Sequence, residues 1–141
     1  MRTLRRSNDS LAMELAAAQA KAIAAVNAAA STVRLRFVTD IPGQELIYSE
    51  KRTEAVAFVA ITPTPVDLTA YPFIAGEVGI TAPTAYEVAQ LYLNLAAQWR
   101  QAGSALETIR LGAVQSIETA TAQSQIDAAL ALMASQLEAL T

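Results

Sequence analysis

The sequence contains neither cysteine nor histidine. Their absence excludes disulfide bonds, thiol catalysis and zinc sites of the Cys/His type, and it removes the usual general base near neutral pH. Any catalysis would have to depend on carboxylates, Lys, Tyr or Ser. We therefore expect no catalytic residue, no metal site, no cofactor and no small-molecule substrate, and we predict that the protein is not an enzyme.

Charged residues are also scarce. They make up 16% of the 141 residues, whereas about 25% is usual in soluble domains. Hydrophobic residues make up 53%, and the mean hydropathy is +0.30. This composition indicates more apolar surface than a small monomer can bury, and hence association with other chains. The alternative is that alanine raises the hydropathy while burying little area.

Long uncharged apolar runs are absent as well. The longest candidate, Leu11 to Val33, contains Glu14 and Lys21, so no run of about 18 residues could span a bilayer. The basic start "MRTLRR" is typical of a signal peptide, but Asp9 and Glu14 interrupt the apolar stretch behind it. We expect a soluble chain without a membrane partner.

The net charge of −3 is unevenly distributed. Up to Arg52 the chain has eight basic and five acidic residues, a balance of +3, and the remainder has a balance of −6. A basic front and an acidic back favour head-to-tail or partner contacts. Nucleic-acid binding is the competing interpretation of the arginines, but they are scattered and no aromatic residues alternate with them. We do not expect nucleic acid as a partner.

A first long helix is predicted from about Ser10. Ser7 or Asp9 can cap it, and its interior is rich in alanine and leucine. Small apolar residues recur along it at spacings of three and four, which favours a closely packed neighbour.

The stretch "RLRFVTDIPGQELIYSEK" allows three interpretations: a strand, a phosphate-binding loop, or a turn between helices. Alternating Val33, Leu35 and Phe37 indicate a strand, but no other segment could pair with it. A phosphate-binding loop would need further glycines and a Lys-Ser/Thr pair. We therefore expect the helix to continue through Phe37 and to end at an elbow formed by Pro42 and Gly43.

Further helices follow the elbow. A second helix is expected from Gln44 to about Ile61, followed by the Pro-rich loop "TPTPVDLTAYP" and a short helix in "FIAGEVGI". Thr84 and Glu87 have the spacing of a capping box, which predicts the start of another long helix.

The clearest periodic feature is an apolar heptad seam, which is typical of helices wrapped on one another. It consists of Val88, Tyr92, Leu95, Trp99, Ala102, Leu106, Ile109, Ala113 and Ile117. Residues 119–124 interrupt the pattern. It resumes in a last helix at Ile126, Leu130, Met133, Leu137 and Leu140.

These patterns predict an all-α fold in which the helices form a bundle with coiled-coil packing. We expect a flexible basic N-terminus over residues 1–9 and a single helical domain over residues 10–141. The residues expected in the core or in interfaces are Tyr92, Leu95, Trp99, Leu106, Ile109, Leu130 and Leu137.

A few residues could have a catalytic or ligand-binding role, but a structural role is the simpler interpretation of each. Glu50 and Glu54 lie one turn apart and could form a carboxylate pair, but we favour a solvated helix face that carries mixed charge. Trp99 could be a ligand platform, although at a seam position a packing role is favoured. Arg100 and Arg110 could bind an anion, but they have acidic neighbours in the sequence.

Several short motifs lie along the chain between about Ala20 and Ala120. They are Pro42-Gly43-Gln44 with Tyr48 and Lys51, Tyr71-Pro72, Glu77-Val78-Gly79-Ile80-Thr81, Glu87-Val88-Ala89, and Trp99. This pattern resembles a small helical module of proteins encoded by tailed bacteriophages and prophages. The module lies near genes for tail fibres or at the end of a fibre protein.

The resemblance implies a bacteriophage virion structural protein, associated with the tail fibre, collar or capsid and acting by helix-mediated assembly. Such a protein would be made in the host cytoplasm and located in the virion. Its expected partners are other phage structural proteins and further copies of the chain, for example in a trimer. The alternative is a tail-fibre assembly chaperone, which binds its client transiently and is absent from the finished particle.

Overall fold

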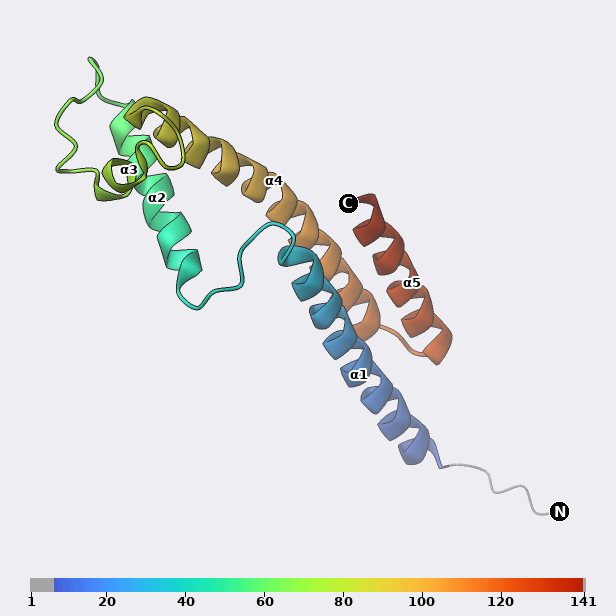
Figure 1. Cartoon of the computed structure of the whole chain (residues 1–141). Coiled ribbons are helices and arrows are strands. Elements are labelled where there is room, and N and C mark those ends of the chain that lie inside the picture. Colours follow the sequence, from blue (N-terminus) through green and yellow to red (C-terminus); the bar gives the residue numbers. More distant parts are fainter. Residues whose placement is uncertain (1–6, 141) are drawn as a thin grey trace. The chain divides into compact units, whose positions relative to one another are not determined.

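The computed structural model describes residues 7–140, which form five helices and no strand. The helices are α1 (Asn8–Arg34), α2 (Gln44–Val59), α3 (Pro72–Glu77), α4 (Ala85–Glu118) and α5 (Gln123–Ala139) (Figure 1). The prediction of an all-α fold with long packed helices is confirmed.

The chain divides into two compact units. Of the described residues, unit 1 comprises those up to Val38 together with those from Ala102 onward, and unit 2 comprises Thr39–Gln101. The sequence led us to expect one helical domain over residues 10–141. The two units share one helix, because α4 supplies its first part to unit 2 and its second part to unit 1.

Unit 1 is a bundle of α1, the second part of α4, and α5, which lie side by side (Figure 1). Its core consists mainly of alanine and aliphatic side chains, and the alanines allow the helices to approach closely. The buried residues are Ala22, Val26, Ala30, Val33, Leu106, Ala113, Ile117, Ala120, Ile126, Ala129, Met133 and Leu137.

The two ends of α1 differ from the prediction. The Ser7 hydroxyl accepts a hydrogen bond of 3.1 Å from the Ser10 amide, so the helix begins at Asn8. The helix ends at Arg34, and the expected continuation through Phe37 is wrong, because Phe37 N bonds to Arg34 O in a tighter turn. Of the expected flexible N-terminus, residues 1–6 lie outside the described part, while Asn8 and Asp9 belong to α1.

The elbow connects α1 to α2. Pro42 is exposed, and Gly43 adopts a φ of 83°, a conformation that side chains with a Cβ rarely take, directly before α2. The second helix ends at Val59, close to the expected end at Ile61.

Unit 2 is formed by α2, α3 and the first part of α4. Its buried residues are Ala55, Phe58, Ile74, Val88, Ala89 and Tyr92. Phe58 also packs edge-to-face on Tyr71, with ring centroids 5.1 Å apart. The predicted capping box before α4 is confirmed: Thr84 Oγ1 accepts from Glu87 N at 3.2 Å, and Thr84 N donates to Glu87 Oε2 at 3.1 Å.

Candidate interaction surfaces

The predicted seam residues are mostly inside the units. Tyr92 is buried in unit 2, Leu106 and Leu137 are buried in unit 1, and Ile109 and Leu130 are packed partly buried against the same unit 1 core. One continuous seam along α4 therefore serves two separate cores.

Two predicted residues lie between these cores in the sequence. Leu95 leaves 53% of its surface exposed, and Trp99 is half-buried. Within the predicted set, Leu95 is the side chain that remains mainly available to a partner.

Glu54 stabilises the start of α3. Its carboxylate accepts hydrogen bonds from Phe73 N at 3.1 Å and from Ile74 N at 2.7 Å. A carboxylate at this position satisfies helix amides that have no partner within the helix. Glu50 is exposed, so the structure does not bring these two acids into a catalytic pair, and Glu54 is not part of a solvated face.

Lys51 joins all three helices of unit 2. Its ammonium forms an ion pair with Glu77 and lies 5.1 Å from the centroid of the Tyr92 ring. The Tyr92 hydroxyl donates to Phe73 O at 3.1 Å, and Glu77 Oε2 accepts from Thr81 Oγ1 at 2.7 Å. These contacts link α2, α3 and α4.

The pKa values of Tyr92 and Glu77 in this cluster are shifted in the directions that preserve its contacts. Burial, together with the neighbouring Glu77 carboxylate, raises the pKa of Tyr92 above its ordinary value, so its hydroxyl remains a neutral donor. Burial alone would raise the pKa of Glu77, but hydrogen bonds from Lys51 and Thr81 outweigh it and lower the pKa. The lowered pKa keeps Glu77 ionised at neutral pH, and the raised pKa keeps the Tyr92 hydroxyl protonated.

The outer face of α2 is an uncharged, partly apolar surface that the sequence analysis missed. Opposite buried Ala55 and Phe58, α2 presents a row of uncharged exposed residues at spacings of three and four, and Leu46 is 73% exposed. The row consists of Leu46, Ser49, Thr53, Val56 and Ala60. The same spacing rule that identified the α4 seam could have found it.

A turn after α3 presents another apolar side chain. Ile80 is strongly exposed. Gly79, with a φ of 81°, donates to Ala82 O at 2.8 Å, while Thr81 N donates to Glu77 O at 2.9 Å. The turn that carries Ile80 is therefore held by hydrogen bonds on both sides.

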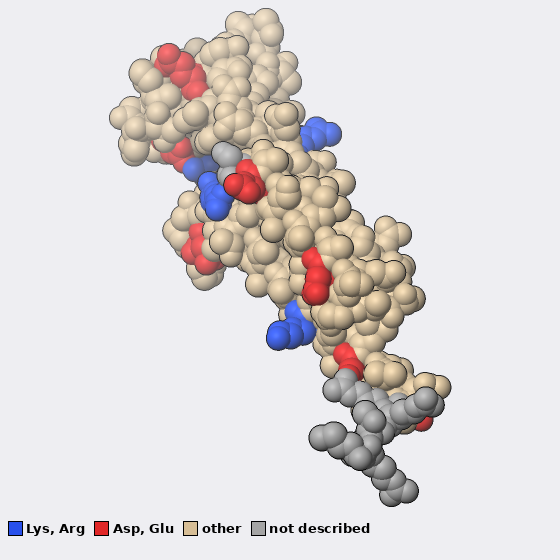
Figure 2. Space-filling view, turned by 90° about the vertical axis from the view of Figure 1, so that its right-hand side faces the viewer, with Lys and Arg blue, Asp and Glu red and all other residues tan. Residues whose placement is uncertain are grey.

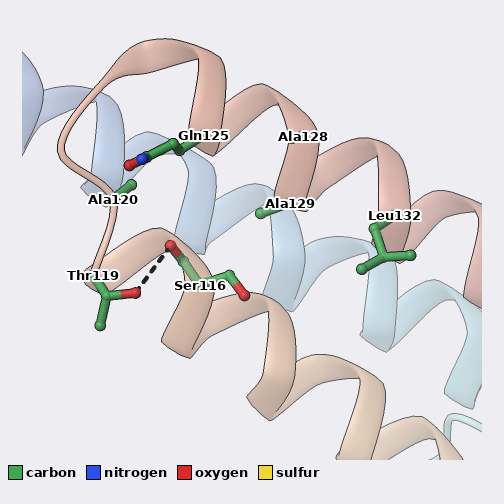
Figure 3. A pocket seen from close by; sticks show the side chains of 7 residues that line it. All are labelled: Ser116, Thr119, Ala120, Gln125, Ala128, Ala129 and Leu132. Carbon is green, nitrogen blue, oxygen red and sulfur yellow. Dashed lines mark hydrogen bonds between the residues drawn. The ribbon is translucent and has the colours of Figure 1, made fainter.

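Unit 1 contains a shallow, open hollow of about 400 Å³ where α4 ends and α5 begins (Figure 3). None of its lining residues is charged. They are Ser116, Thr119, Ala120, Gln125, Ala128, Ala129 and Leu132. The hollow offers contact area to an apolar side chain and no group for acid–base chemistry.

On the face drawn in Figure 2, basic and acidic side chains lie beside one another in one area and are scattered elsewhere, so no patch of a single sign is seen there. Arg110 is engaged within unit 1: it pairs with Glu107 at 2.6 Å and donates to Asn27 Oδ1 at 3.1 Å. In residues 7–140, no group of three acids could hold a metal ion. No helix of that part is long and apolar enough to cross a bilayer.

No family model matches the sequence, and neither a curated protein nor a solved structure is significantly similar to it.

Proposed function

We propose that this protein is a bacteriophage structural protein that assembles with other particle proteins, and with copies of itself, through exposed uncharged helix faces. The observation that carries the proposal is the outer face of α2. Leu46 and Val56 are large apolar side chains that unit 2 leaves in solvent on a stripe with heptad spacing. A partner helix can bury such a stripe.

Contacts inside unit 2 support a structural role. Four polar side chains of the unit bind one another or backbone atoms of the unit. They are Lys51, Glu54, Glu77 and Tyr92. Polar groups that bind one another in this way make the unit rigid, so the side chains on its surface are held in fixed positions.

The phage setting is supported by the sequence resemblance alone. Four residues of the resembling motifs, Lys51, Tyr71, Glu77 and Thr81, take part in the packing of unit 2. In this proposal, the motif residues keep the helical unit folded. The protein is located in the virion, and its partners are other phage structural proteins.

Sedimentation equilibrium at micromolar concentration tests self-assembly. We expect an oligomer for the unaltered chain and a lower association constant for the double variant Leu46→Lys/Val56→Lys. The matched control is Ile61→Lys/Val66→Lys, which adds the same two charges at exposed apolar residues in the segment after α2. A monomer at all concentrations would contradict self-assembly. If the control lowers the association constant as much as the double variant does, the copies do not associate through the α2 face.

A tail-fibre assembly chaperone is the second candidate. The observation that favours it is the absence of any strand in residues 7–140, so the described part contributes no β-structure to a fibre. Mass spectrometry of purified particles separates the candidates, because a structural protein is present in stoichiometric amounts and a chaperone is absent. Absence from both particles and fibre-assembly intermediates would contradict the phage setting.

A further inference from the structure

The helix α4 passes from unit 2 into unit 1 without ending. It runs from Ala85 to Glu118, and the boundary between the units lies inside it, after Gln101. The chain crosses between the units at one other point, after Val38, in the segment between α1 and α2 that contains the elbow. Any change in the orientation of one unit against the other therefore has to bend α4.

The middle of α4 contributes no buried side chain to either core. Tyr92 is the last buried residue of α4 in unit 2, and Leu106 is the first one in unit 1. Residues 93–105 are all half-buried or exposed, and they make about 20 Å of helix at 1.5 Å per residue. Because most of the stability of a helix in a protein comes from its packed face, this stretch depends more on its own helix propensity than the rest of α4 does.

A glycine and a serine stand next to each other in this stretch, directly after the unit boundary. Gly103 and Ser104 both have lower helix propensity than the alanines around them. Sharp bends in helices are found at such Gly/Ser pairs. The carbonyl of Ser104 also accepts a hydrogen bond of 3.0 Å from Thr108 Oγ1, a contact that often accompanies a bend.

We propose that α4 bends at Gly103 and Ser104, and that this pair is a hinge between unit 1 and unit 2. Each unit keeps its core during the motion, because no buried residue lies between Tyr92 and Leu106. The elbow at Gly43 adds no helix that would oppose the motion. A partner that binds both units can then select one orientation from those that the hinge allows. This inference is independent of the proposed function, because it concerns the chain by itself.

Gly112 offers a comparison within the same helix. It is exposed, and a Cβ added there would meet no neighbouring atom within 4 Å. The next residue, Ala113, is buried in the unit 1 core, so α4 is packed at this point. We therefore expect Gly112 to lower the helix propensity without acting as a hinge.

Spin labels on introduced cysteines measure the motion directly, because the chain has no cysteine of its own. One pair of labels joins Ser49 in unit 2 to Ser135 in unit 1, and a reference pair joins Ala17 to Ser135 within unit 1. All three positions are exposed. The labelled protein is diluted with an excess of unlabelled protein, so that only distances within one chain are recorded. We expect pulsed electron spin resonance to give a distribution about twice as broad for the pair across the units as for the reference pair.

The double variant Gly103→Ala/Ser104→Ala should narrow the broad distribution towards the width of the reference pair, because alanine favours a continuous helix. Amide hydrogen exchange in residues 93–105 should also become about fivefold slower. The matched control Gly112→Ala/Ser116→Ala makes the same two changes in the part of α4 that belongs to unit 1, and it should leave the distribution broad.

A second variant covers the case in which the half-buried Gly103 does not accept a side chain. Ser104→Ala alone lies at an exposed position and adds no atom, so it should narrow the distribution by a smaller amount. Circular dichroism and the reference pair check that every variant keeps its helices and the packing of unit 1.

Three results would overturn the proposal. Equal widths for the two label pairs in the unaltered protein would mean that the units are fixed to each other. A broad distribution that neither variant narrows would mean that the motion does not depend on Gly103 and Ser104. Equal narrowing by the control would mean that helix propensity acts along the whole of α4, without a hinge at this pair.

Discussion

The carboxylate of Glu54 accepts a hydrogen bond of 2.7 Å from the backbone amide of Ile74, which joins the middle of α2 to the first turn of α3. The second carboxylate oxygen accepts from Phe73 N, so one side chain satisfies two amides of a helix of only six residues. Such a short helix has few bonds of its own, and we therefore expect it to depend on this contact.

Replacing Glu54 by alanine should lower the free energy of unfolding of unit 2 by about 1–2 kcal/mol, because two partly buried amides lose their acceptor. The measurement is urea unfolding followed by Trp and Tyr fluorescence. Glu50→Ala is the matched control: it removes the same side chain from an exposed position one turn away on α2. An equal loss in both variants would show that Glu54 acts through helix propensity alone.

The Glu77 carboxylate makes unit 2 sensitive to acid. Its pKa is lowered from the ordinary value of 4.5 by Lys51 and Thr81, so its stabilising contribution is present above about pH 4.5 and is lost as the pH falls through the folded-state pKa. At neutral pH the unaltered protein should melt at a higher temperature than Glu77→Gln. The gap should close as the pH is lowered, in a series of thermal melts from pH 7 to about pH 3.

Asp67 and Glu107 also have lowered pKa values, and both remain in the Glu77→Gln variant, so they contribute equally to the two curves. Parallel curves at all pH values would contradict the role given to Glu77.

Gln19 should stabilise unit 1 through the end of α4. Its amide group donates to the carbonyls of Ile117, Glu118 and Ala120 where α4 ends, and Ile117 O accepts only one further bond, from Ala120 N at 3.2 Å, among those described. Gln19→Ala should lower the free energy of unfolding by about 1 kcal/mol, measured by urea unfolding. Gln136→Ala, at an exposed position on α5, should change it by less than about 0.5 kcal/mol.

The two cores should respond separately to mutation. Phe58 is buried in unit 2 and Ile117 in unit 1, so truncating either to alanine should cost about 2–5 kcal/mol through a cavity. Hydrogen exchange followed by mass spectrometry should show faster exchange in α2 and α3 for Phe58→Ala, and in α1 and α5 for Ile117→Ala. Faster exchange in all four helices for either variant would show that the units unfold together.

Local features were predictable from the sequence because they depend on neighbouring residues. The capping box of Thr84 and Glu87 has its partners three residues apart, and it was found where expected. The heptad pattern likewise identified α4 and α5 and correctly indicated an all-α fold. The end of α1 was placed about one turn too late, since the tighter hydrogen bonds after Arg34 have no strong sequence signal.

Long-range features were not predictable in this way. The bond of Glu54 to Ile74 depends on how α2 packs against α3, and the spacing of apolar residues in the sequence carries no information on that contact. The seam from Tyr92 to Leu106 continues unbroken past the unit boundary, so its pattern could not reveal that the two residues belong to different cores. The hollow beside Leu132 arises because two helices end near each other, which is again a tertiary property.

Unit 2 interrupts unit 1 in the sequence, and this order matters during synthesis. The ribosome adds roughly 5–20 residues per second, so α1 leaves the exit tunnel several seconds before the α4–α5 hairpin that will cover it. Unit 2 can complete its core within that interval, whereas the apolar seam of α1 must wait until α5 has been synthesised. The newborn chain therefore carries an uncovered, alanine-rich helix, which makes that interval the time when an early partner or a chaperone has the best access to it.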